Sequence, residues 1–261
     1  MKREDFLWAH LKALPYFRSL LRAVEANYYQ DVEFPEPVLD VGCGDGHFAT
    51  IAFDHRINIG IDPDLQSLRE ARSRNAYRWL VQSDGARLPY PDDSIGSAFS
   101  NSVLEHIPHL DAVLQEVGRV LKPGALFQFT VPNPGYREEL SFPNWLKRLG
   151  LRSLARWYRK WFMDMSRTIH MYDREGWQAK LGLAGFTIER SFDYFAPSAL
   201  HVLEWGHYFG APCLLPRAIL GRWIIAPRRW NLWLTDRFVR RYYDPTPKEE
   251  GTYSYYLARK L

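Results

Sequence analysis

The sequence contains few cysteines and no long apolar segment, and each shortage excludes a class of protein. Only Cys43 and Cys213 occur among 261 residues, too few for the disulfide framework of a small secreted domain. Cys43 lies in a glycine-rich turn, so we expect free thiols in a reducing compartment. The absence of any run of about 18 apolar residues argues against a membrane-spanning helix. Residues 1–5 mix charges and lead into no apolar segment, so we expect no signal peptide and a cytoplasmic protein.

Metal-ligand spacings, internal repeats and low-complexity tracts are also missing. The histidines and cysteines show no spacing typical of a metal site, so we expect none. The apolar share of 46% is ordinary for a chain that buries a core. The length suits one α/β domain with insertions, or two small domains.

Charge is unevenly distributed along the chain. The segment 36–135 has 8 Lys and Arg against 13 Asp and Glu, a net charge of −5. Since the whole chain carries +4, the flanking segments together carry +9. Tryptophans are also concentrated outside the segment 36–135, so the basic flanks are aromatic as well.

Strands and helices are predicted to alternate through the first half of the chain. Residues 5–30 have the apolar spacing of one or two amphipathic helices, with a break at Pro15. Predicted strands follow at 37–41, 57–61, 77–82, 95–100 and 125–131, and predicted helices at 46–54, 64–74 and 109–121. Alternation of this kind indicates a mostly parallel sheet with helices on both faces. Later elements are predicted as helices at 142–163 and 173–183 and as strands at 186–190 and 252–259.

A glycine-rich turn follows the first strand, in the sequence VLDVGCGDGHF at 38–48. Its glycines, Gly42, Gly44 and Gly46, allow a sharp bend, and the next helix directs free N–H groups at a bound ligand. The G-x-G-x-G spacing differs from the G-x-G-x-x-G of dinucleotide sites. Asp40 suits a positively charged ligand better than a pyrophosphate. The alternative is a glycine turn without a ligand.

Further polar residues stand at the ends of later strands. Asp62, 22 residues beyond Asp40, is placed to bind ribose hydroxyls, or else to cap a helix. Asp84 is placed to accept from an adenine amine while the Ala86 N–H donates to the ring, or else to form an Asp-Gly turn. Ser100 and Asn101 end the fourth strand, at the edge that borders a ligand crevice.

Five segments, in their order and spacing, resemble the motifs of class I S-adenosylmethionine-dependent methyltransferases. This group includes the ubiquinone/menaquinone-biosynthesis enzymes and many small-molecule enzymes. The matching segments are Asp40–Gly46, Asp62, Ser83–Gly85, Val103–Ile107 and Leu121–Ala125. Together they cover roughly residues 37–133, under half of the chain.

The resemblance implies a fold, a cofactor and a set of contacts. The implied fold is α/β, a Rossmann-like doubly wound sheet of seven strands, mostly parallel, with a last antiparallel strand at 252–259. The implied cofactor is S-adenosylmethionine, as methyl donor. The residues implied to contact it are Asp40, Gly42, Cys43, Gly44, Gly46, Asp62, Pro63, Asp84, Gly85, Ala86, Ser100 and Asn101.

Methyl transfer is an in-line displacement that asks the protein for alignment, exclusion of water and sometimes a base. His106, just beyond the fourth strand, is the first candidate base; the alternative is that it orders the loop together with Glu105. His170, a second catalytic candidate, and Tyr172, a candidate substrate contact, precede the helix 173–183, a region that often lies across the substrate pocket in related enzymes. The alternative role for both is packing or capping.

The basic, aromatic insertions complete the predicted organisation of a single domain. Its parts are a helical cap at 1–35, a cofactor-binding core at 36–135, a helical insertion at 140–165, an apolar and basic lid at 197–250 and a final strand at 251–261. An apolar stripe is predicted from Leu146, Leu149, Leu154, Trp157 and Trp161. From the lid, Trp205 and Tyr208 are candidate substrate contacts.

Two interpretations of these insertions remain open. They form a lid that approaches an anionic membrane surface or admits a lipid-like substrate, or they pack as a cap with exposed arginines. Nucleic acid is disfavoured, because no RNA-binding module is visible and the fourth strand lacks the Asn-Pro-Pro-Tyr motif of enzymes that methylate base amines. We therefore expect methyl transfer to a small-molecule or lipid-like acceptor, with no obligate protein partner evident. The alternative is a non-catalytic module that binds S-adenosylmethionine and docks on a membrane or protein partner.

Overall fold

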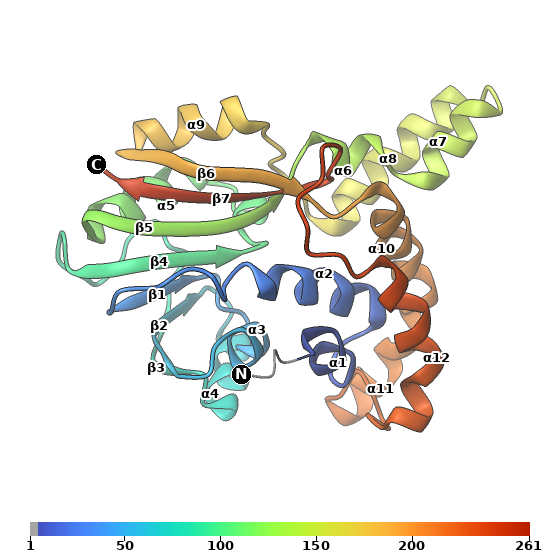
Figure 1. The fold of residues 1–261 in the computed structure, drawn as a ribbon, viewed down its shortest axis with the longest axis horizontal. Coiled ribbons are helices and arrows are strands. Elements are labelled where there is room, and N and C mark those ends of the chain that lie inside the picture. Colours follow the sequence, from blue (N-terminus) through green and yellow to red (C-terminus); the bar gives the residue numbers. More distant parts are fainter. Residues whose placement is uncertain (1–4) are drawn as a thin grey trace.

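The seven strands form one sheet in the order β3-β2-β1-β4-β5-β7-β6, and helices cover both of its faces (Figure 1). The computed structural model describes residues 5–261, so residues 1–4 of the predicted cap lie outside the described residues. The strands are β1 Val38–Val41, β2 Ile57–Asp62, β3 Tyr77–Gln82, β4 Ile95–Asn101, β5 Leu121–Pro132, β6 Phe186–Tyr194 and β7 Tyr253–Lys260. Strand β7 runs antiparallel to both β5 and β6, while β1 to β5 are parallel. The predicted fold is therefore confirmed.

Twelve α-helices connect and cover these strands within the described part of the chain. They are α1 Phe6–Leu11, α2 Tyr16–Asn27, α3 His47–Ala52, α4 Leu65–Arg74, α5 Leu110–Val120, α6 Pro134–Glu138, α7 Ser141–Arg148, α8 Arg152–Ser166, α9 Arg174–Leu183, α10 Pro197–Phe209, α11 Leu214–Leu220 and α12 Arg229–Val239. Pro15 stands directly before α2, where the chain was predicted to break. One core cluster joins α5 and α9 to the sheet, and a second joins α1 to α4 to it.

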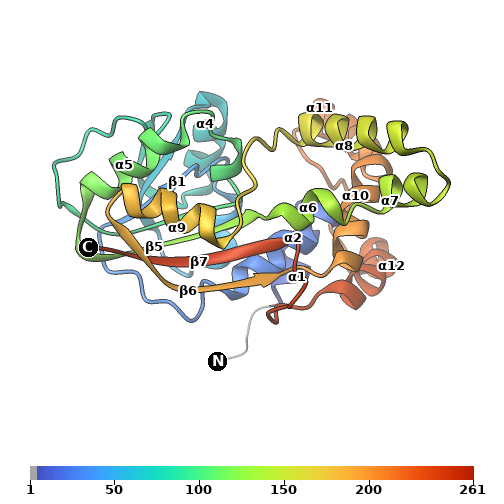
Figure 2. The ribbon, with the colours of Figure 1, turned by 90° about the horizontal axis from the view of Figure 1, so that it is seen from above.

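The later helices gather beyond the carboxyl ends of the parallel strands. Figure 1 places α7, α8 and α10 to α12 at that end, and Figure 2 shows them together and apart from α5 and α9. The segment 197–250 was predicted only as an apolar lid, yet much of it is helical. No helices were predicted there, because prolines at 197, 212, 216 and 227 give the segment the pattern of an irregular connection.

The predicted apolar stripe on α7 and α8 does not form a packing surface. Leu154 and Trp157 are 45% and 60% exposed, and Leu149, which follows α7, is 55% exposed. The buried side of α8 is formed instead by Ala155, Tyr158, Phe162 and Met163. The insertion thus packs on the domain through another face and leaves most of the predicted stripe exposed.

A fully buried carboxylate fixes α2 across the ends of the strands. Glu25 accepts hydrogen bonds from Arg22 Nη1 at 2.8 Å and Asn101 Nδ2 at 2.7 Å. It also accepts from the hydroxyls of Ser102 at 2.5 Å and Tyr194 at 2.9 Å. Because a buried charge is tolerated only when it is paired and hydrogen-bonded, this set of donors accounts for Glu25 in the interior. The network joins α2 to β4 and β6.

We predict that Glu25→Gln destabilises the protein, because the substitution removes the charge that Arg22 and three neutral donors share. The free energy of unfolding should fall by about 3–5 kcal/mol, the range for breaking a buried ion pair. Urea denaturation followed by circular dichroism measures this difference. The exposed Glu33→Gln serves as control and should change stability by less than about 0.5 kcal/mol. Equal stability of the two variants would show that the network does not anchor α2.

Candidate functional site

A cavity of about 460 Å³ lies where β1, β2 and β4 end, beneath α2. Such a place, at the carboxyl edge of an open parallel sheet, is where ligands bind in α/β folds. Half of the residues predicted to contact the cofactor line it: Asp40, Gly42, Cys43, Gly44, Asp62 and Asn101. These side chains come from separate segments of the chain, and the topology brings them together.

The glycine turn has the backbone conformation that its residues predict. Gly42, Gly44 and Gly46 have φ values of 81°, 52° and 72°, in the left-handed region that favours glycine. A Cβ on Gly42 would collide with Val103 Cγ1 at 2.3 Å, whereas a Cβ on Gly44 would meet nothing within 4 Å. Gly44 therefore leaves its backbone open toward the cavity. Gly46 does not line the cavity and begins α3 instead.

Asp40 is a buried carboxyl in the wall of the cavity. Tyr77 donates its phenolic hydrogen to Asp40 Oδ2 at 2.6 Å. Burial raises the pKa of Asp40 to about 7; the bond from Tyr77 opposes this rise and the charge of Asp62 adds to it. A cation placed in the cavity would stabilise the ionised form. Burial also raises the pKa of the Cys43 thiol, which makes it an unreactive part of the wall.

Asp62 closes β2 and holds the glycine turn. Its Oδ2 accepts from the Gly44 N–H at 2.9 Å, and its Oδ1 accepts from the Asp64 N–H at 2.9 Å. Burial raises the pKa of Asp62. The helix cap that the sequence left open as an alternative role belongs to Asp64, which caps α4 through the N–H groups of Gln66 and Ser67. Pro63 is exposed and lies outside the cavity lining.

Asp84, Gly85 and Ala86 follow β3 and do not line the cavity. Asp84 Oδ1 accepts the Ala86 N–H at 3.1 Å, and Asp84 Oδ2 lies 3.4 Å from Nε2 of His109. The Ala86 N–H predicted to donate to a ring is thus used within the turn. They follow β3, which is the neighbour of β2 in the sheet.

The two residues at the end of β4 differ in position. Ser100 is fully buried, and its hydroxyl donates to the Val41 carbonyl at 2.8 Å, so its side chain serves the sheet and not the cavity. Asn101 lines the cavity, and its Oδ1 accepts from Thr130 while its amide donates to Glu25. Both residues were predicted to border the ligand crevice, and of the two only Asn101 lines the cavity.

Two arginines of α2 add positive charge that the sequence analysis did not assign. Arg18 and Arg22 both line the cavity, and Arg22 Nη1 donates to the Asn101 carbonyl at 3.1 Å. Among the described residues Arg18 has no ion pair or hydrogen bond, and its guanidinium lies 5.8 Å from the ring centre of Trp223. In the sequence, the sign that Arg18 and Arg22 share one side of a helix was their spacing of four residues. It resembles the exposed face of any amphipathic helix, so it could not reveal a cavity.

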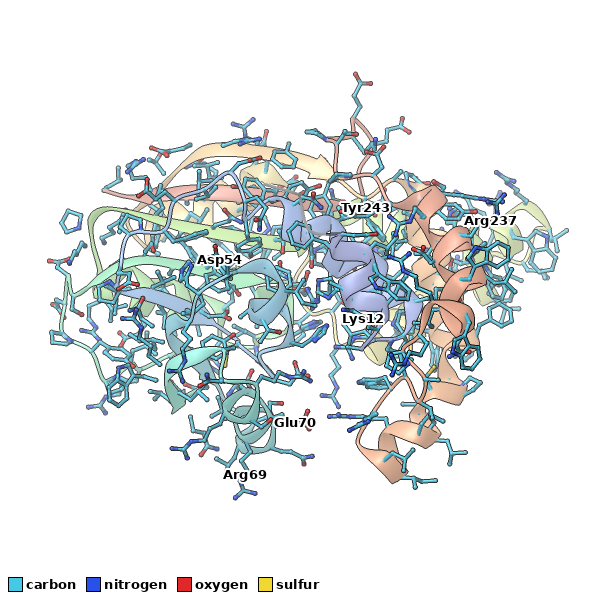
Figure 3. All side chains as sticks on the ribbon, turned by 60° about the horizontal axis from the view of Figure 1, so that its bottom comes forward. Lys12, Asp54, Arg69, Glu70, Arg237 and Tyr243 are labelled. Atoms are coloured by element: carbon cyan, nitrogen blue, oxygen red, sulfur yellow. The ribbon has the colours of Figure 1, made fainter. Side chains whose placement is uncertain are left out.

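The lid reaches across this cavity and is held by an ion pair. Arg217 of α11 contacts both carboxylate oxygens of Glu70 on α4, at 2.6 and 2.9 Å. Figure 3 shows Glu70 on α4. Trp223 follows α11 and lies 5.8 Å from the guanidinium carbons of both Arg18 and Arg217. The Arg217–Glu70 pair, called here the lid latch, joins the lid to the cofactor-binding core.

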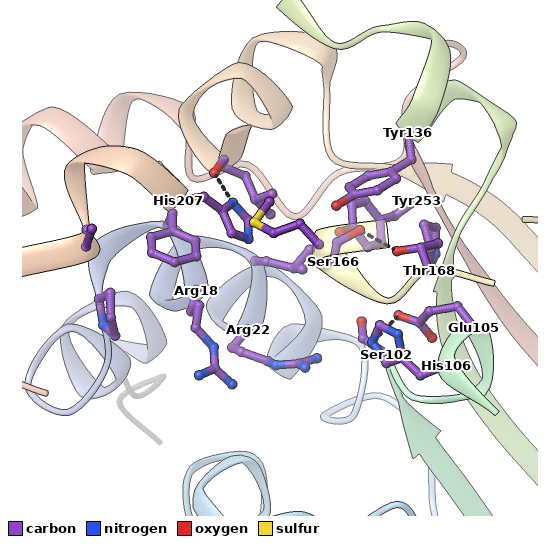
Figure 4. Close-up of a pocket in the computed structure, with 18 of the residues that line it drawn as sticks. Arg18, Arg22, Ser102, Glu105, His106, Tyr136, Ser166, Thr168, His207 and Tyr253 are labelled. Carbon is purple, nitrogen blue, oxygen red and sulfur yellow. Dashed lines mark hydrogen bonds and ion pairs between the residues drawn. The ribbon is translucent and has the colours of Figure 1, made fainter. Parts of the chain in front are cut away.

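A second cavity of about 460 Å³ adjoins the first. Four residues line both: Arg18, Arg22, His106 and Trp223. In Figure 4 the two arginines extend from α2, and Ser102, Glu105 and His106 lie across from them. The second cavity is otherwise bounded by the lid and by hydroxyl-bearing side chains, Tyr136, Ser166, Thr168 and Tyr253 among them.

His106 therefore stands at the junction of the two cavities, as its candidate role as a base requires. Its Nδ1 lies 2.9 Å from the Arg167 carbonyl, a contact that requires the proton on Nδ1 and leaves the lone pair on Nε2. Burial lowers the pKa of His106, so the ring is neutral at pH 7.

The other four candidates lie away from both cavities. His170 uses Nε2 on the Ile107 carbonyl at 2.9 Å and Nδ1 on the Tyr172 hydroxyl at 3.1 Å, so both side chains hold the segment before α9. Trp205 and Tyr208 line a separate aromatic groove of about 290 Å³. Its lining is Phe142, Trp157, Tyr158, Trp161, Trp205 and Tyr208. Over residues 5–261, no three His, Cys, Asp or Glu side chains come together as a metal site.

Comparison with known proteins identifies the family. A family profile described as a methyltransferase domain matches residues 39–129. An uncharacterised methyltransferase of Mycobacterium tuberculosis is 31% identical over 210 residues, covering 78% of this chain and 71% of the relative. The chain belongs to the class I S-adenosylmethionine-dependent methyltransferases.

Solved structures agree on the fold of this methyltransferase. An S-adenosylmethionine-dependent enzyme of Thermotoga maritima, described as a possible histamine N-methyltransferase, aligns with a TM-score of 0.55 at 14% identity, covering 94% of this chain and 90% of its own. Phosphoethanolamine N-methyltransferase 2 of Haemonchus contortus, solved with S-adenosylmethionine, aligns with a TM-score of 0.56 at 16% identity, covering 92% and 52%.

The first cavity offers charged groups of both signs, and the cofactor of this family also carries both signs. S-adenosylmethionine carries an amino group, a sulfonium, a carboxylate and two ribose hydroxyls. The first cavity offers carboxylates from Asp40 and Asp62, guanidinium groups from Arg18 and Arg22, and open backbone at Gly44. Both signs of charge are therefore available to a ligand that carries both.

We predict that Asp62→Ala weakens binding of S-adenosylmethionine and of its demethylated product by about 10- to 100-fold, as expected when a hydrogen bond to a charged group is lost. Isothermal titration calorimetry measures both affinities. Asp54→Ala, at a fully exposed carboxylate that follows α3, is the control and should leave binding unchanged. An affinity of Asp62→Ala equal to that of the control would show that the ribose lies elsewhere.

Proposed function

We propose that the methyltransferase binds S-adenosylmethionine in the first cavity and a small-molecule or lipid-like acceptor in the second. The observation that supports this arrangement is the shared wall of Arg18, Arg22, His106 and Trp223. A methyl donor in one cavity and a nucleophile in the other would meet at that wall. We infer that the whole chain acts as one domain, because cap, core and lid all contribute to the two cavities.

In this proposal four charged groups of the first cavity have partners on the cofactor. Asp62 accepts from the ribose hydroxyls, Asp40 faces the amino group, and Arg18 with Arg22 holds the carboxylate. When bound, the cofactor supplies an electrophilic methyl group on a positively charged sulfur. The residues of the chain align the two reactants and exclude water, and such alignment lowers the barrier without new chemistry.

The second cavity has the mixed lining that an amphiphilic acceptor needs. Phe17, Leu21 and Leu203 provide apolar walls, while Glu105 and the hydroxyls of Tyr136 and Tyr253 provide polar ones. Few precisely placed polar groups in a largely apolar wall are typical of small-molecule sites. His106, at the junction, is proposed to order the wall between donor and acceptor.

The proposed activity is tested by transfer of a labelled methyl group from S-adenosylmethionine to metabolite and lipid extracts. We expect label in a new product that separates with a small polar or an amphiphilic fraction, and we expect Asp62→Ala to reduce the yield. Labelled product in the organic phase points to a lipid acceptor. Tight cofactor binding with no transfer to either extract would instead support a non-catalytic binding module.

We further propose that the protein acts in the cytoplasm and that its lid face contacts an anionic membrane surface. Most large exposed apolar side chains of the described residues lie in 140–165 and 197–250, among them Trp157, Phe209 and Trp230. A groove of about 830 Å³ is lined by Arg137, Lys147, Arg156, Arg159 and Lys160, together with Glu138 and Glu139. Exposed apolar and basic groups in the same segments suit a headgroup layer. Within residues 5–261 the helices are too short or too polar to cross a bilayer.

From this contact we predict that the protein co-sediments with vesicles that contain phosphatidylglycerol. Added salt should release the protein from the vesicles, because it screens the basic groups. Trp230→Ser removes an apolar side chain that is 78% exposed on α12 and should reduce binding. The matched control is Trp79→Ser, since Trp79 is 71% exposed on β3, far from the lid. Equal loss in both variants, or no binding at low salt, contradicts a membrane-facing lid.

A further inference from the structure

Glu105 is a buried carboxyl without a complete set of partners. It is 3% exposed, it lines the second cavity, and its Oε2 has no hydrogen-bond partner within the described part of the chain. Its backbone carbonyl accepts from the N–H groups of Ile169 at 2.8 Å and His170 at 3.1 Å, so its position is fixed from both sides. An unsatisfied buried carboxyl costs stability, and groups of this kind concentrate at functional sites.

The charged and titratable groups around Glu105 come from several elements. His106 Nε2 lies 3.7 Å from Glu105 Oε1, too far for a hydrogen bond. From α2, the charge of Arg22 favours the ionised carboxylate and that of Glu25 opposes it. The phenols of Tyr136 and Tyr253 line the same cavity. Burial is the largest influence and raises the pKa of Glu105 to about 8.

We propose that the Glu105 carboxylate accepts the proton of the acceptor nucleophile, and that the acceptor is therefore an O–H or N–H group. This inference rests on the proposed function. In the balanced step the heteroatom bonds to the methyl carbon, the carbon–sulfur bond breaks with its electron pair kept by sulfur, and the heteroatom proton moves to Glu105. A carbon nucleophile without an acidic proton would have no use for this group.

His106 acts as a positioning residue in this scheme. Its Nδ1–H is committed to the Arg167 carbonyl, and its Nε2 lies 3.7 Å from Glu105 Oε1, on a side chain that lines both cavities. The ring thereby limits the orientations open to the carboxyl group. Glu105 keeps one oxygen without a partner, whereas both ring nitrogens of His106 are directed at named neighbours.

The first test needs no acceptor. A nearby positive charge favours the ionised carboxylate, so the sulfonium of S-adenosylmethionine should release protons from Glu105 near pH 8, and the uncharged thioether of the demethylated product should release fewer. Calorimetry in buffers of different ionisation enthalpy measures proton release for both ligands. Proton release from Asp40 should be the same for the two ligands, because both carry the amino group that faces it. Glu105→Gln, which preserves shape, should abolish the difference between them.

The second test uses the acceptor fraction found by methyl labelling. Wild-type turnover should rise about tenfold per pH unit below the pKa of Glu105 and level off above it, since only the carboxylate accepts a proton. Glu105→Gln should lower turnover by about 10²- to 10⁴-fold and flatten this profile. The exposed Glu175→Gln on α9 is the control and should behave as wild type.

The outcomes separate this inference from the proposed function. If no extract accepts a methyl group, the proposed methyl transfer to a small-molecule or lipid-like acceptor fails. The difference in proton release between the two ligands still decides whether the Glu105 carboxyl responds to the sulfonium. Unchanged proton release and an unchanged pH profile in Glu105→Gln overturn the inference. So does a variant His106→Gln that alone removes the pH dependence, because His106 would then be the base.

Discussion

The buried carboxylate of Glu25 is the constraint on which the arrangement of the site depends. It holds α2 against the ends of β4 and β6 through three donors, Asn101, Ser102 and Tyr194, while Arg22 pairs with it within the helix. Because α2 is fixed there, Arg18 and Arg22 project over the strand ends, and the space beyond those ends is divided into two cavities. The same helix lines both cavities, so the anchor that stabilises the fold also defines the geometry of the proposed reaction.

The cavity environment changes the acid–base properties of the groups around it. Burial raises the pKa of both Asp40 and Glu105, to about 7 and about 8. These carboxyls lie in different cavities and face different partners, a phenol for Asp40 and an imidazole for Glu105. Two carboxyls poised near neutrality, on either side of one wall, suit a site that receives a cation on one side and a proton on the other.

Local sequence patterns predicted the parts of the fold that depend on local physics. The glycine turn, the strand at 57–61 and the final strand were predicted because glycine conformation and apolar periodicity act over a few residues. Asp40 and Asp62 were placed together because parallel strands bring their carboxyl ends to one edge. The role of α2 in the site was not predicted, since only tertiary packing distinguishes Arg18 from a solvated arginine.

The lid latch links the proposed donor and acceptor cavities. Trp223, beside the latch, lines both cavities, so a movement of the lid there would open both together. A partly exposed ion pair such as Arg217–Glu70 contributes only about 0–1 kcal/mol, so the latch by itself opposes such a movement weakly. In the proposed function, the demethylated cofactor and the methylated product would leave through this shared opening, and the release rate of each would depend on the same movement.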